Sequence, residues 1–250
     1  MSPRAKKSLG QNFLMHAKTA ARIADVARLS PDSVVFEVGP GTGMLTHELL
    51  LRSKKVIALE ADGELVEKMR HDLADDVELG KLELIHGDVR EFDLGTLPAG
   101  YAVVANIPYY LTGELFRRFL EDDNQPSSMT LLVQKEVADR IANAKKESIL
   151  SLSVKAYGAP KREFIVPRGA FVPAPGVDSA VLTISGISRK YFRDRDQERR
   201  FFDLLHAGFG HKRKLLASNL MEAGVPKDAV PAGMRAEDAP LDFWLHLSAF

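Results

Sequence analysis

Apolar runs and amphipathic stretches alternate along the first half of the chain. Short runs rich in β-branched and aromatic residues predict buried strands over residues 33–38, 56–60, 82–88 and 101–105. Helical spacing of apolar residues predicts helices over residues 16–29, 44–52, 62–73 and 112–120. Strands that alternate with helices are typical of an α/β fold built on a mainly parallel sheet.

The second half of the chain changes character. Further β segments are expected at residues 130–134, 149–157, 163–166 and 177–185. Helical patterns joined by turns with Pro and Gly then follow at residues 196–209, 212–223 and 241–249. This switch predicts a first α/β domain over residues 1–185 and a small helical domain over residues 186–250.

Composition excludes several classes of protein. The 250 residues are 45% hydrophobic, enough for a full core, and include no cysteine. Disulfides, thiolate metal sites and cysteine nucleophiles are therefore excluded, and the seven scattered histidines lack metal-ligand spacing. No apolar run reaches the ~18 residues of a membrane span, and the basic N-terminus lacks the apolar core of a signal peptide. We therefore expect a cytoplasmic protein without a metal.

A glycine-rich turn separates the first strand from its helix. The turn Gly39-Pro-Gly-Thr-Gly43 follows the strand directly, an arrangement typical of ligand-binding turns in doubly wound sheets. Glycine lets the backbone approach a ligand, and the helix N-terminus offers free N–H groups. The spacing differs from dinucleotide and phosphate-loop motifs. Glu37, two residues before Gly39, favours a ligand with a cationic amino group over a pyrophosphate.

Acidic residues end the next two strands. Glu60 closes the second strand, close to where doubly wound folds place a carboxylate for ribose hydroxyls. Asp88 closes the third strand, where it can accept a hydrogen bond from an adenine amine. The alternatives are a surface acid at Glu60 and a loop cap at Asp88. Because ligands bind at the carboxyl ends of parallel strands, both acids are expected to face the glycine turn.

The stretch Asn106-Ile-Pro-Tyr109 follows the fourth strand. Pro108 fixes its own φ and biases Ile107 towards an extended conformation. The Ile107 carbonyl is therefore expected beside the side-chain carbonyl of Asn106. Two acceptors next to the Tyr109 ring suit a flat group that bears an NH2, such as adenine. The alternative is a plain turn in which Asn106 satisfies the backbone and Tyr109 covers the core.

Together these motifs resemble those of the rRNA adenine N6,N6-dimethyltransferases, over about residues 4–220. The motifs that carry the resemblance are residues 9–14, 37–43, 60, 87–88, 106–109, 132–140 and 171–180. The last two favour the small-subunit branch. The resemblance implies a Rossmann-like class I S-adenosylmethionine-dependent methyltransferase sheet with a small C-terminal helical domain. It also implies dimethylation of two adjacent adenines near the 3′ end of small-subunit rRNA, in ribosome biogenesis.

The resemblance implies roles for individual residues. The expected cofactor contacts are Gln11, Asn12, Leu14, Glu37, Gly39, Gly41, Glu60, Asp88, Val89 and Asn106. The residues expected around the target adenine are Asn106, Ile107, Pro108, Tyr109 and Phe171. The ring of Tyr109, and not its hydroxyl, would stack on one face of the flipped base, and Phe171 would close the other. The alternative for Phe171 is a core residue before a Pro-x-Pro turn.

Clusters of Lys and Arg indicate where RNA would bind. Residues 1–12 look like a flexible basic arm, and residues 186–214 hold nine Lys/Arg against four Asp/Glu. The expected phosphate contacts are Arg4, Lys6, Lys7, Arg199, Arg200, Lys212, Arg213 and Lys214. The alternative is an ordinary solvated surface. The expected partner is small-subunit rRNA or a pre-assembled small ribosomal subunit, bound by a monomer.

Two other functions stay open. The macrolide-resistance branch, which acts on large-subunit rRNA, also carries Asn-Ile-Pro-Tyr, although Gln134-Lys-Glu136 favours the small-subunit branch. A non-catalytic RNA-binding assembly or transcription factor of the same fold is the second, and the intact motifs argue against it. Departures from the family pattern occur at residues 143–153, at Gly176 and at residues 210–214, all expected to face RNA.

Overall fold

The computed structural model describes residues 5–6 and 9–249, and a seven-stranded sheet forms its centre. The strand order is β4-β3-β2-β5-β6-β9-β7. The strands are β2 (Val34–Val38), β3 (Lys55–Glu60), β4 (Leu82–His86), β5 (Ala102–Asn106), β6 (Ser128–Gln134), β7 (Ala159–Val166) and β9 (Ser179–Ser185). The first five are parallel, whereas β9 runs antiparallel to both β6 and β7. The predicted α/β class is confirmed.

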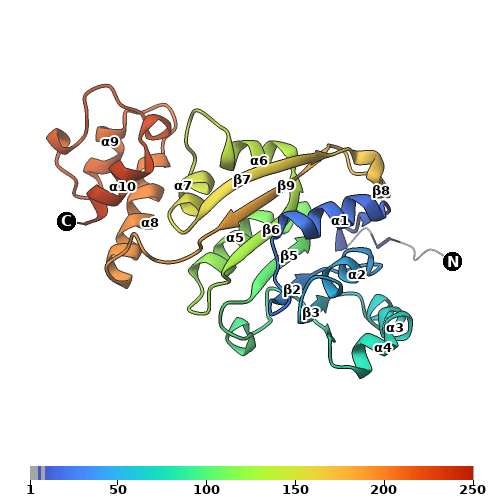
Figure 1. The fold of residues 1–250 in the computed structure, drawn as a ribbon. Helices are drawn as coiled ribbons and strands as arrows, with labels where there is room; N and C mark the ends of the chain where they lie inside the picture. Colours follow the sequence, from blue (N-terminus) through green and yellow to red (C-terminus); the bar gives the residue numbers. More distant parts are fainter. Residues whose placement is uncertain (1–4, 7–8, 250) are drawn as a thin grey trace.

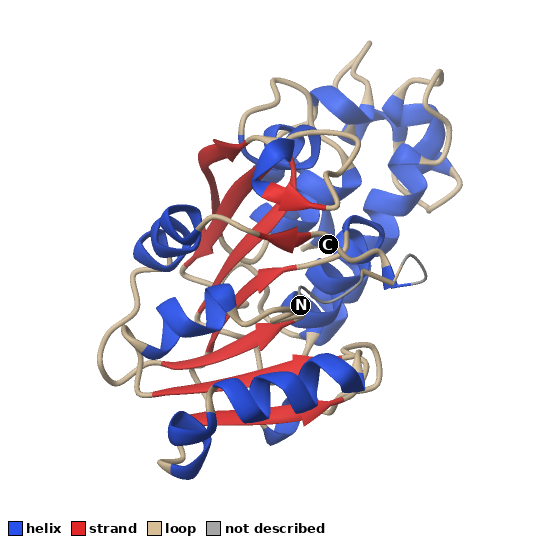
Figure 2. Ribbon diagram, turned by 90° about the vertical axis from the view of Figure 1, so that its right-hand side faces the viewer, coloured by secondary structure: helices blue, strands red, loops and turns tan. Residues whose placement is uncertain are grey.

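Helices cover both faces of the sheet (Figures 1 and 2). One face carries α1 (Ala17–Val26), α2 (Met44–Leu50), α3 (Gly63–Asp72) and α4 (Ala74–Glu78). The other carries α5 (Thr112–Glu121), α6 (Lys135–Ala142) and α7 (Ile149–Lys155). Successive strand residues point to opposite faces, so Val35 packs in the cluster with α1 and α2 while Phe36 packs in the cluster with α5.

One predicted strand is a helix. Residues 149–157 were expected to be β, but α7 spans Ile149–Lys155. The Leu-Ser-Leu-Ser-Val alternation imitates a strand. Ser148 starts the helix with a capping box, in which its side chain and that of Ser151 each accept from the other's backbone N–H. Ser153 Oγ then donates to the Ile149 carbonyl at 2.7 Å, so the serines satisfy helical backbone and not a strand ladder.

The C-terminal helices lie together at one end of the molecule (Figure 1). They are α8 (Arg195–Phe209), α9 (Leu216–Met221) and α10 (Leu241–Ser248). Fully buried Trp244 and Phe201 belong to the same apolar cluster as α5. Buried Glu198 of α8 accepts a hydrogen bond from the Tyr157 hydroxyl at 2.5 Å. Strand β9 ends at Ser185, and the division into two domains at this point remains a prediction.

A short strand pair was not anticipated. Strand β1 (Phe13–Leu14) pairs antiparallel with β8 (Phe171–Val172). This pairing fastens the N-terminal segment next to the carboxyl edge of the parallel strands. The remaining short elements are the 3-10 turns η2 (Leu94–Thr96), η3 (Tyr109–Leu111), η4 (Arg168–Ala170), η5 (Lys227–Ala229) and η6 (Ala236–Asp238). Within residues 5–6 and 9–249, no helix has the length and apolar character needed to cross a membrane.

Candidate active site

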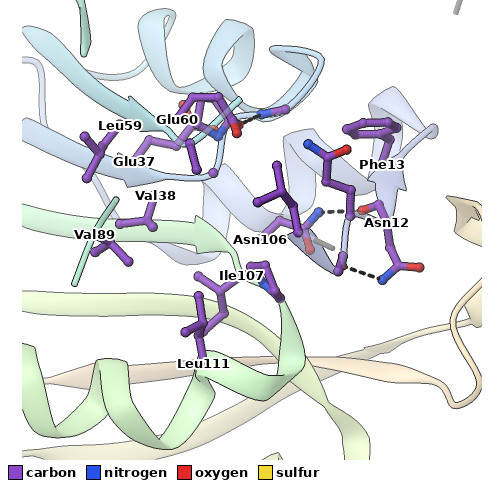
Figure 3. A pocket seen from close by; sticks show the side chains of 18 of the residues that line it. Asn12, Phe13, Glu37, Val38, Leu59, Glu60, Val89, Asn106, Ile107 and Leu111 are labelled. Atoms are coloured by element: carbon purple, nitrogen blue, oxygen red, sulfur yellow. Dashed lines mark hydrogen bonds between the residues drawn. The ribbon is translucent and has the colours of Figure 1, made fainter. Parts of the chain in front are cut away.

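A cavity opens at the carboxyl edge of the parallel strands (Figure 3). All ten residues expected to contact the cofactor line it, together with Ile107, Pro108 and Tyr109. Phe171 is not among the lining residues. The rule that ligands bind where parallel strands end therefore predicted where this cavity lies.

The glycine turn lines the cavity and has a left-handed backbone at its glycines. Gly41 has a φ of +61°, which side chains larger than hydrogen rarely tolerate. A Cβ on Gly41 would lie 3.1 Å from Cδ1 of Phe13 in β1. The N–H of Gly41 donates to Oε2 of Glu60 at 3.0 Å. This hydrogen bond joins the turn after β2 to the end of β3.

Glu60 is buried at the end of β3, with 6% of its surface exposed. Its second oxygen, Oε1, accepts from the N–H of Asp62 at 3.0 Å. Burial is the largest influence on its pKa and raises it. A carboxylate oxygen has two lone pairs, so the bonds to Gly41 and Asp62 leave capacity for ribose hydroxyls. These two N–H donors hold the carboxylate in one orientation.

Glu37 in β2 is more deeply buried, with 1% of its surface exposed. Burial raises the pKa of Glu37 to about 8, and the nearby Glu60 carboxylate adds to the effect. Its Oε2 has no hydrogen-bond partner among the described residues. A buried polar atom without a partner is costly and calls for an explanation. A ligand with a cationic amino group fits this position, because it would supply both a donor and a positive charge.

Asp88 lines the cavity but already holds partners. Its Oδ2 lies 2.5 Å from Nη2 of Arg90, and its Oδ1 accepts from the Arg90 N–H at 2.9 Å. The Arg90 guanidinium lowers the pKa of Asp88. Asp88 thus forms the loop cap that was the alternative in the sequence. Its remaining lone pairs are still available to an adenine amine.

The N-terminal segment covers the cavity and fixes Asn106. Nδ2 of Asn106 donates to the backbone carbonyl of Asn12 at 3.2 Å (Figure 3). Gln11 Nε2 donates to Asp62 Oδ2 at 3.3 Å, and Lys6 Nζ lies 2.8 Å from Asp62 Oδ1. Residues 9–12 line the cavity, so this part of the expected basic arm lies against the rest of the protein. No spacing in the sequence signals a contact between Lys6 and Asp62.

The two expected adenine acceptors lie side by side in sequence at the end of β5. Ile107 is buried, and Pro108 has φ −57° and ψ 133°. Tyr109 begins the turn η3 and is partly buried. Burial raises the pKa of Tyr109 above the ordinary tyrosine value, at which the hydroxyl is already protonated at neutral pH. That hydroxyl lies 2.6 Å from Oγ of Ser179, a contact that sequence reasoning missed.

Phe171 lies away from the cavity in this structure. Its exposed surface is 2%, and it faces Leu14 in the β1–β8 pair. It packs in the apolar cluster on the side of α1 and α2. This position matches the core alternative, and Phe171 would have to move to contact a base.

The expected RNA contacts fall into three groups. Arg200, Lys212, Arg213 and Lys214 are exposed on the helical part of the chain. Arg199 is also exposed and lies 3.4 Å from Asp196. Lys6 is instead held by two carboxylates, those of Asp62 and Glu64. Arg4 and Lys7 lie outside the described residues. Within the described part of the chain, no group of His, Asp or Glu side chains is arranged to hold a metal ion.

A mainly parallel seven-stranded sheet with a cavity at the carboxyl ends of its strands is the arrangement of Rossmann-like methyltransferases. Sequence comparison narrows the class further. The profile of the family "Ribosomal RNA adenine dimethylase" matches residues 3–239. This chain therefore belongs to the ribosomal RNA adenine dimethylase family. It is an rRNA adenine dimethyltransferase, and the family uses a methyl donor of the S-adenosylmethionine type.

Individual relatives agree with this assignment. "Ribosomal RNA small subunit methyltransferase A" of Dehalococcoides mccartyi is 38% identical over 259 residues, which cover 96% of this chain and 86% of the relative. The protein of the same name from Deinococcus radiodurans is 38% identical, and the match covers 94% of this chain and 82% of that protein.

Two solved structures share the fold. The 23S rRNA methyltransferase ErmE superposes with a TM-score of 0.80 at 26% identity, and the match covers 95% of this chain and 98% of that one. A dimethyladenosine transferase from Plasmodium falciparum superposes with a TM-score of 0.79 at 23% identity, with 94% and 95% covered. The second likeness concerns the fold alone.

Proposed function

We propose that this enzyme dimethylates two adjacent adenines near the 3′ end of small-subunit rRNA, with S-adenosylmethionine as the donor. The observation that carries the proposal is the arrangement of Asn106. Its amide nitrogen donates to the Asn12 carbonyl, so its amide oxygen points away from Asn12. Asn106 and Ile107 both line the cavity, where that oxygen and the Ile107 carbonyl would form a pair of acceptors for the target amine. The relatives named for small-subunit methylation, at 38% identity, support the choice of RNA.

The cavity offers a partner for each part of the cofactor. Glu37 would meet the amino group, the N–H groups around Gly39 and Gly41 would meet the carboxylate, and Glu60 would accept from the ribose hydroxyls. Asp88 and Val89 would lie at the adenine ring, and Gln11, Asn12 and Leu14 would cover the ligand from the N-terminal segment. The bound cofactor supplies an electrophilic methyl group on a sulfonium.

The residues of the chain act on the target amine by orienting it. The amine lone pair of adenine is delocalised into the ring. When Asn106 and the Ile107 carbonyl accept hydrogen bonds from the amine hydrogens, they favour a pyramidal nitrogen whose lone pair faces the methyl group. Orientation and preorganised acceptors then supply much of the acceleration. No side-chain base is needed, because the product nitrogen loses its proton after transfer. The ring of Tyr109 holds the flipped base by stacking.

The helical part of the chain, residues 186–250, would hold the RNA backbone as a separate domain. Exposed Arg200, Lys212, Arg213 and Lys214 support this role, because phosphate contacts by cations dominate affinity for RNA. Arg199 would have to exchange Asp196 for a phosphate. Lys6 has two carboxylate partners, so among the predicted contacts it is the one that these pairs least support as a phosphate contact. Arg4 and Lys7 remain predicted contacts of the N-terminal arm.

Methylation of large-subunit rRNA is the second candidate, because ErmE shares the fold at 26% identity. The deciding experiment incubates the enzyme with radiolabelled S-adenosylmethionine and either unmethylated small subunits or large subunits, and then maps the label. Label on two adjacent adenines near the 3′ end of small-subunit rRNA is expected. Label in large-subunit rRNA alone would overturn the choice of RNA, and no label in either would overturn the proposed activity.

A further inference from the structure

The hydroxyl of Tyr109 is held by a serine that lies far away in the sequence. Ser179 has none of its surface exposed, and its Oγ lies 2.6 Å from the Tyr109 hydroxyl. A hydrogen bond of this length between hydroxyls is well formed. Because Ser179 is shielded from solvent, water does not compete for its hydroxyl. Removing either group would leave the other without this partner.

The antiparallel direction of β9 brings Ser179 to the active edge of the sheet. In the parallel strands only the last residues reach this edge, as Asn106 does in β5. Asn106 pairs with Leu132 of β6, and Leu132 pairs with Val181 of β9. Since β9 runs in the opposite direction, its first residue, Ser179, lies two positions beyond Val181 towards the cavity edge. There it reaches Tyr109, three residues after Asn106.

The backbone around Ser179 is fixed independently of Tyr109. The carbonyl of Asp178 accepts from the N–H of Lys135 at 3.0 Å. The Asp178 side chain accepts from the N–H of Arg168 at 2.9 Å. Ser179 itself pairs with Gln134 on one side and with Val166 on the other. The serine therefore presents its hydroxyl from a rigid point of the sheet.

We infer that Ser179 is a positioning residue for methyl transfer, which holds the Tyr109 ring at the place where it stacks on the target adenine. A tyrosine ring is attached to the chain at one end and carries its hydroxyl at the other. Anchoring both ends stops the ring from swinging, so its face stays available to the base. This inference rests on the proposed role of the Tyr109 ring, and it assigns the hydroxyl a part that the sequence did not suggest.

The test is a double-mutant cycle with Ser179→Ala, Tyr109→Phe and the two combined. Single-turnover methylation of unmethylated small subunits at saturating cofactor should slow by about 3- to 10-fold in each single variant, the rate equivalent of one net hydrogen bond. The combined variant should be no slower than the slower single variant, because both changes remove the same bond. The apparent affinity for subunits should not change.

A spectroscopic measurement separates positioning from stability. RNA with 2-aminopurine at the target position should gain fluorescence when the base leaves its stack, and stacking on Tyr109 should quench part of that gain. Both single variants should quench it less and so be brighter in complex than wild type. The combined variant should regain thermal stability, because two apolar partners leave no buried group unpaired, but it should not regain rate. Tyr101→Phe is the matched control, because it removes a tyrosine hydroxyl bond to the Asn124 carbonyl, 3.2 Å long, outside the cavity. It should keep wild-type rate and quenching.

The outcomes distinguish this inference from the proposed function. If Tyr109→Ala methylates at the wild-type rate, the stacking role itself is wrong and the inference falls with it. If Tyr109→Ala is slow but both Ser179→Ala and Tyr109→Phe keep wild-type rate and quenching, the inference alone is overturned. Losses that multiply in the combined variant would also overturn it. Should Ser179→Ala fail to fold, Tyr109→Phe removes the same bond without altering the serine and decides the matter.

Discussion

The proposed cofactor side of the cavity and the exposed cations of the C-terminal helical part use charge in opposite ways. Glu37 and Glu60 are buried, and Glu60 is held by two backbone N–H groups. Lys212, Arg213 and Lys214 are exposed on a turn. A buried carboxylate charge is costly unless a partner meets it in the right geometry, which is why Glu37 keeps its proton in the absence of a ligand. An exposed cation costs little and acts at many positions. Methyl transfer by this enzyme should therefore depend on single residues. Affinity for RNA should instead depend on how many exposed cations take part.

The largest expected effect is that of Asn106→Ala. The change removes one acceptor and leaves the cavity and the Glu60 contacts in place, so methyl transfer should slow by at least ~10²-fold. RNA affinity should barely change, because phosphate contacts dominate it. Single-turnover methylation with separately measured RNA binding tests both statements. Asn124→Ala, which loses amide bonds to Leu94 and Leu97 outside the cavity, is the control and should keep its rate. A wild-type rate in Asn106→Ala would remove the residue from the chemistry.

Changes at Glu60 and Gly41, which are proposed to contact the cofactor, should have the next largest effect. Glu60→Ala should weaken S-adenosylmethionine binding by about 1–3 kcal/mol, the cost of unpaired buried partners. Gly41→Arg should weaken it at least as much, because φ is +61° and Phe13 lies 3.1 Å from the new Cβ. Calorimetry measures both. Gly100→Ala is a matched control, because it has a φ of +78° with open space around it. Unchanged affinity in both site variants would refute the assignment of Glu60 and Gly41 as cofactor contacts.

The buried carboxyl of Glu37 predicts a dependence of stability on pH. Burial raises the pKa of Glu37 from 4.5 to about 8, so between these values the folded chain keeps a proton that the unfolded chain has lost. Its contribution to the free energy of unfolding is complete below pH 4.5 and is lost as the pH rises through about 8. Urea unfolding without cofactor should show that the free energy of unfolding falls more between pH 6 and pH 9 for wild type than for Glu37→Gln. Equal falls would mean that Glu37 does not hold this proton.

Single cations of the helical part, where we propose that RNA binds, should have the smallest effects. Neutralising Lys212, Arg213 or Lys214 one at a time should lower the slope of log affinity against log salt by about 0.7–0.9 per lost contact. The losses should add when the changes are combined, and cofactor affinity should stay constant. Lys54 is an exposed lysine just before β3, at the amino ends of the parallel strands and so away from the cavity. Lys54→Ala should leave the slope unchanged. A slope that stays constant in the triple variant would make this turn ordinary solvated surface.

The sequence predicted the elements that follow simple local rules. Strand ends and the glycine turn were predicted, because apolar periodicity and turn chemistry decide them locally. Asp62, the first residue of the helix predicted over residues 62–73, caps α3 and accepts from the Glu64 N–H at 3.1 Å. Seven of the ten expected cofactor residues lie at or just after strand ends and line one cavity for the same reason, whereas Gln11, Asn12 and Leu14 were implied by the family resemblance. Their individual roles remain predictions.

The features that the sequence did not predict depend on distant parts of the chain. Ser179 reaches the cavity because β9 is antiparallel, which strand spacing alone does not reveal. The contact between Lys6 and Asp62 joins two segments that have no shared pattern. The strand predicted over residues 149–157 was wrong for a local reason. Alternating serines resemble a strand unless the capping box of Ser148 is recognised. Phe171 shows that a motif can identify a residue without fixing which way its side chain packs.

The pairing of β1 with β8 has a consequence for the synthesis of the enzyme. Phe13 is made near the beginning of the chain, yet its partner Val172 is made only after most of the sheet. A nascent chain can therefore assemble β2 to β6 and the glycine turn while its N-terminal segment still has no strand to pair with. Contacts between such distant residues form late, because closing a long loop costs entropy. The cavity therefore acquires its cover only after residue 172 has been made, when the glycine turn and the five parallel strands already exist.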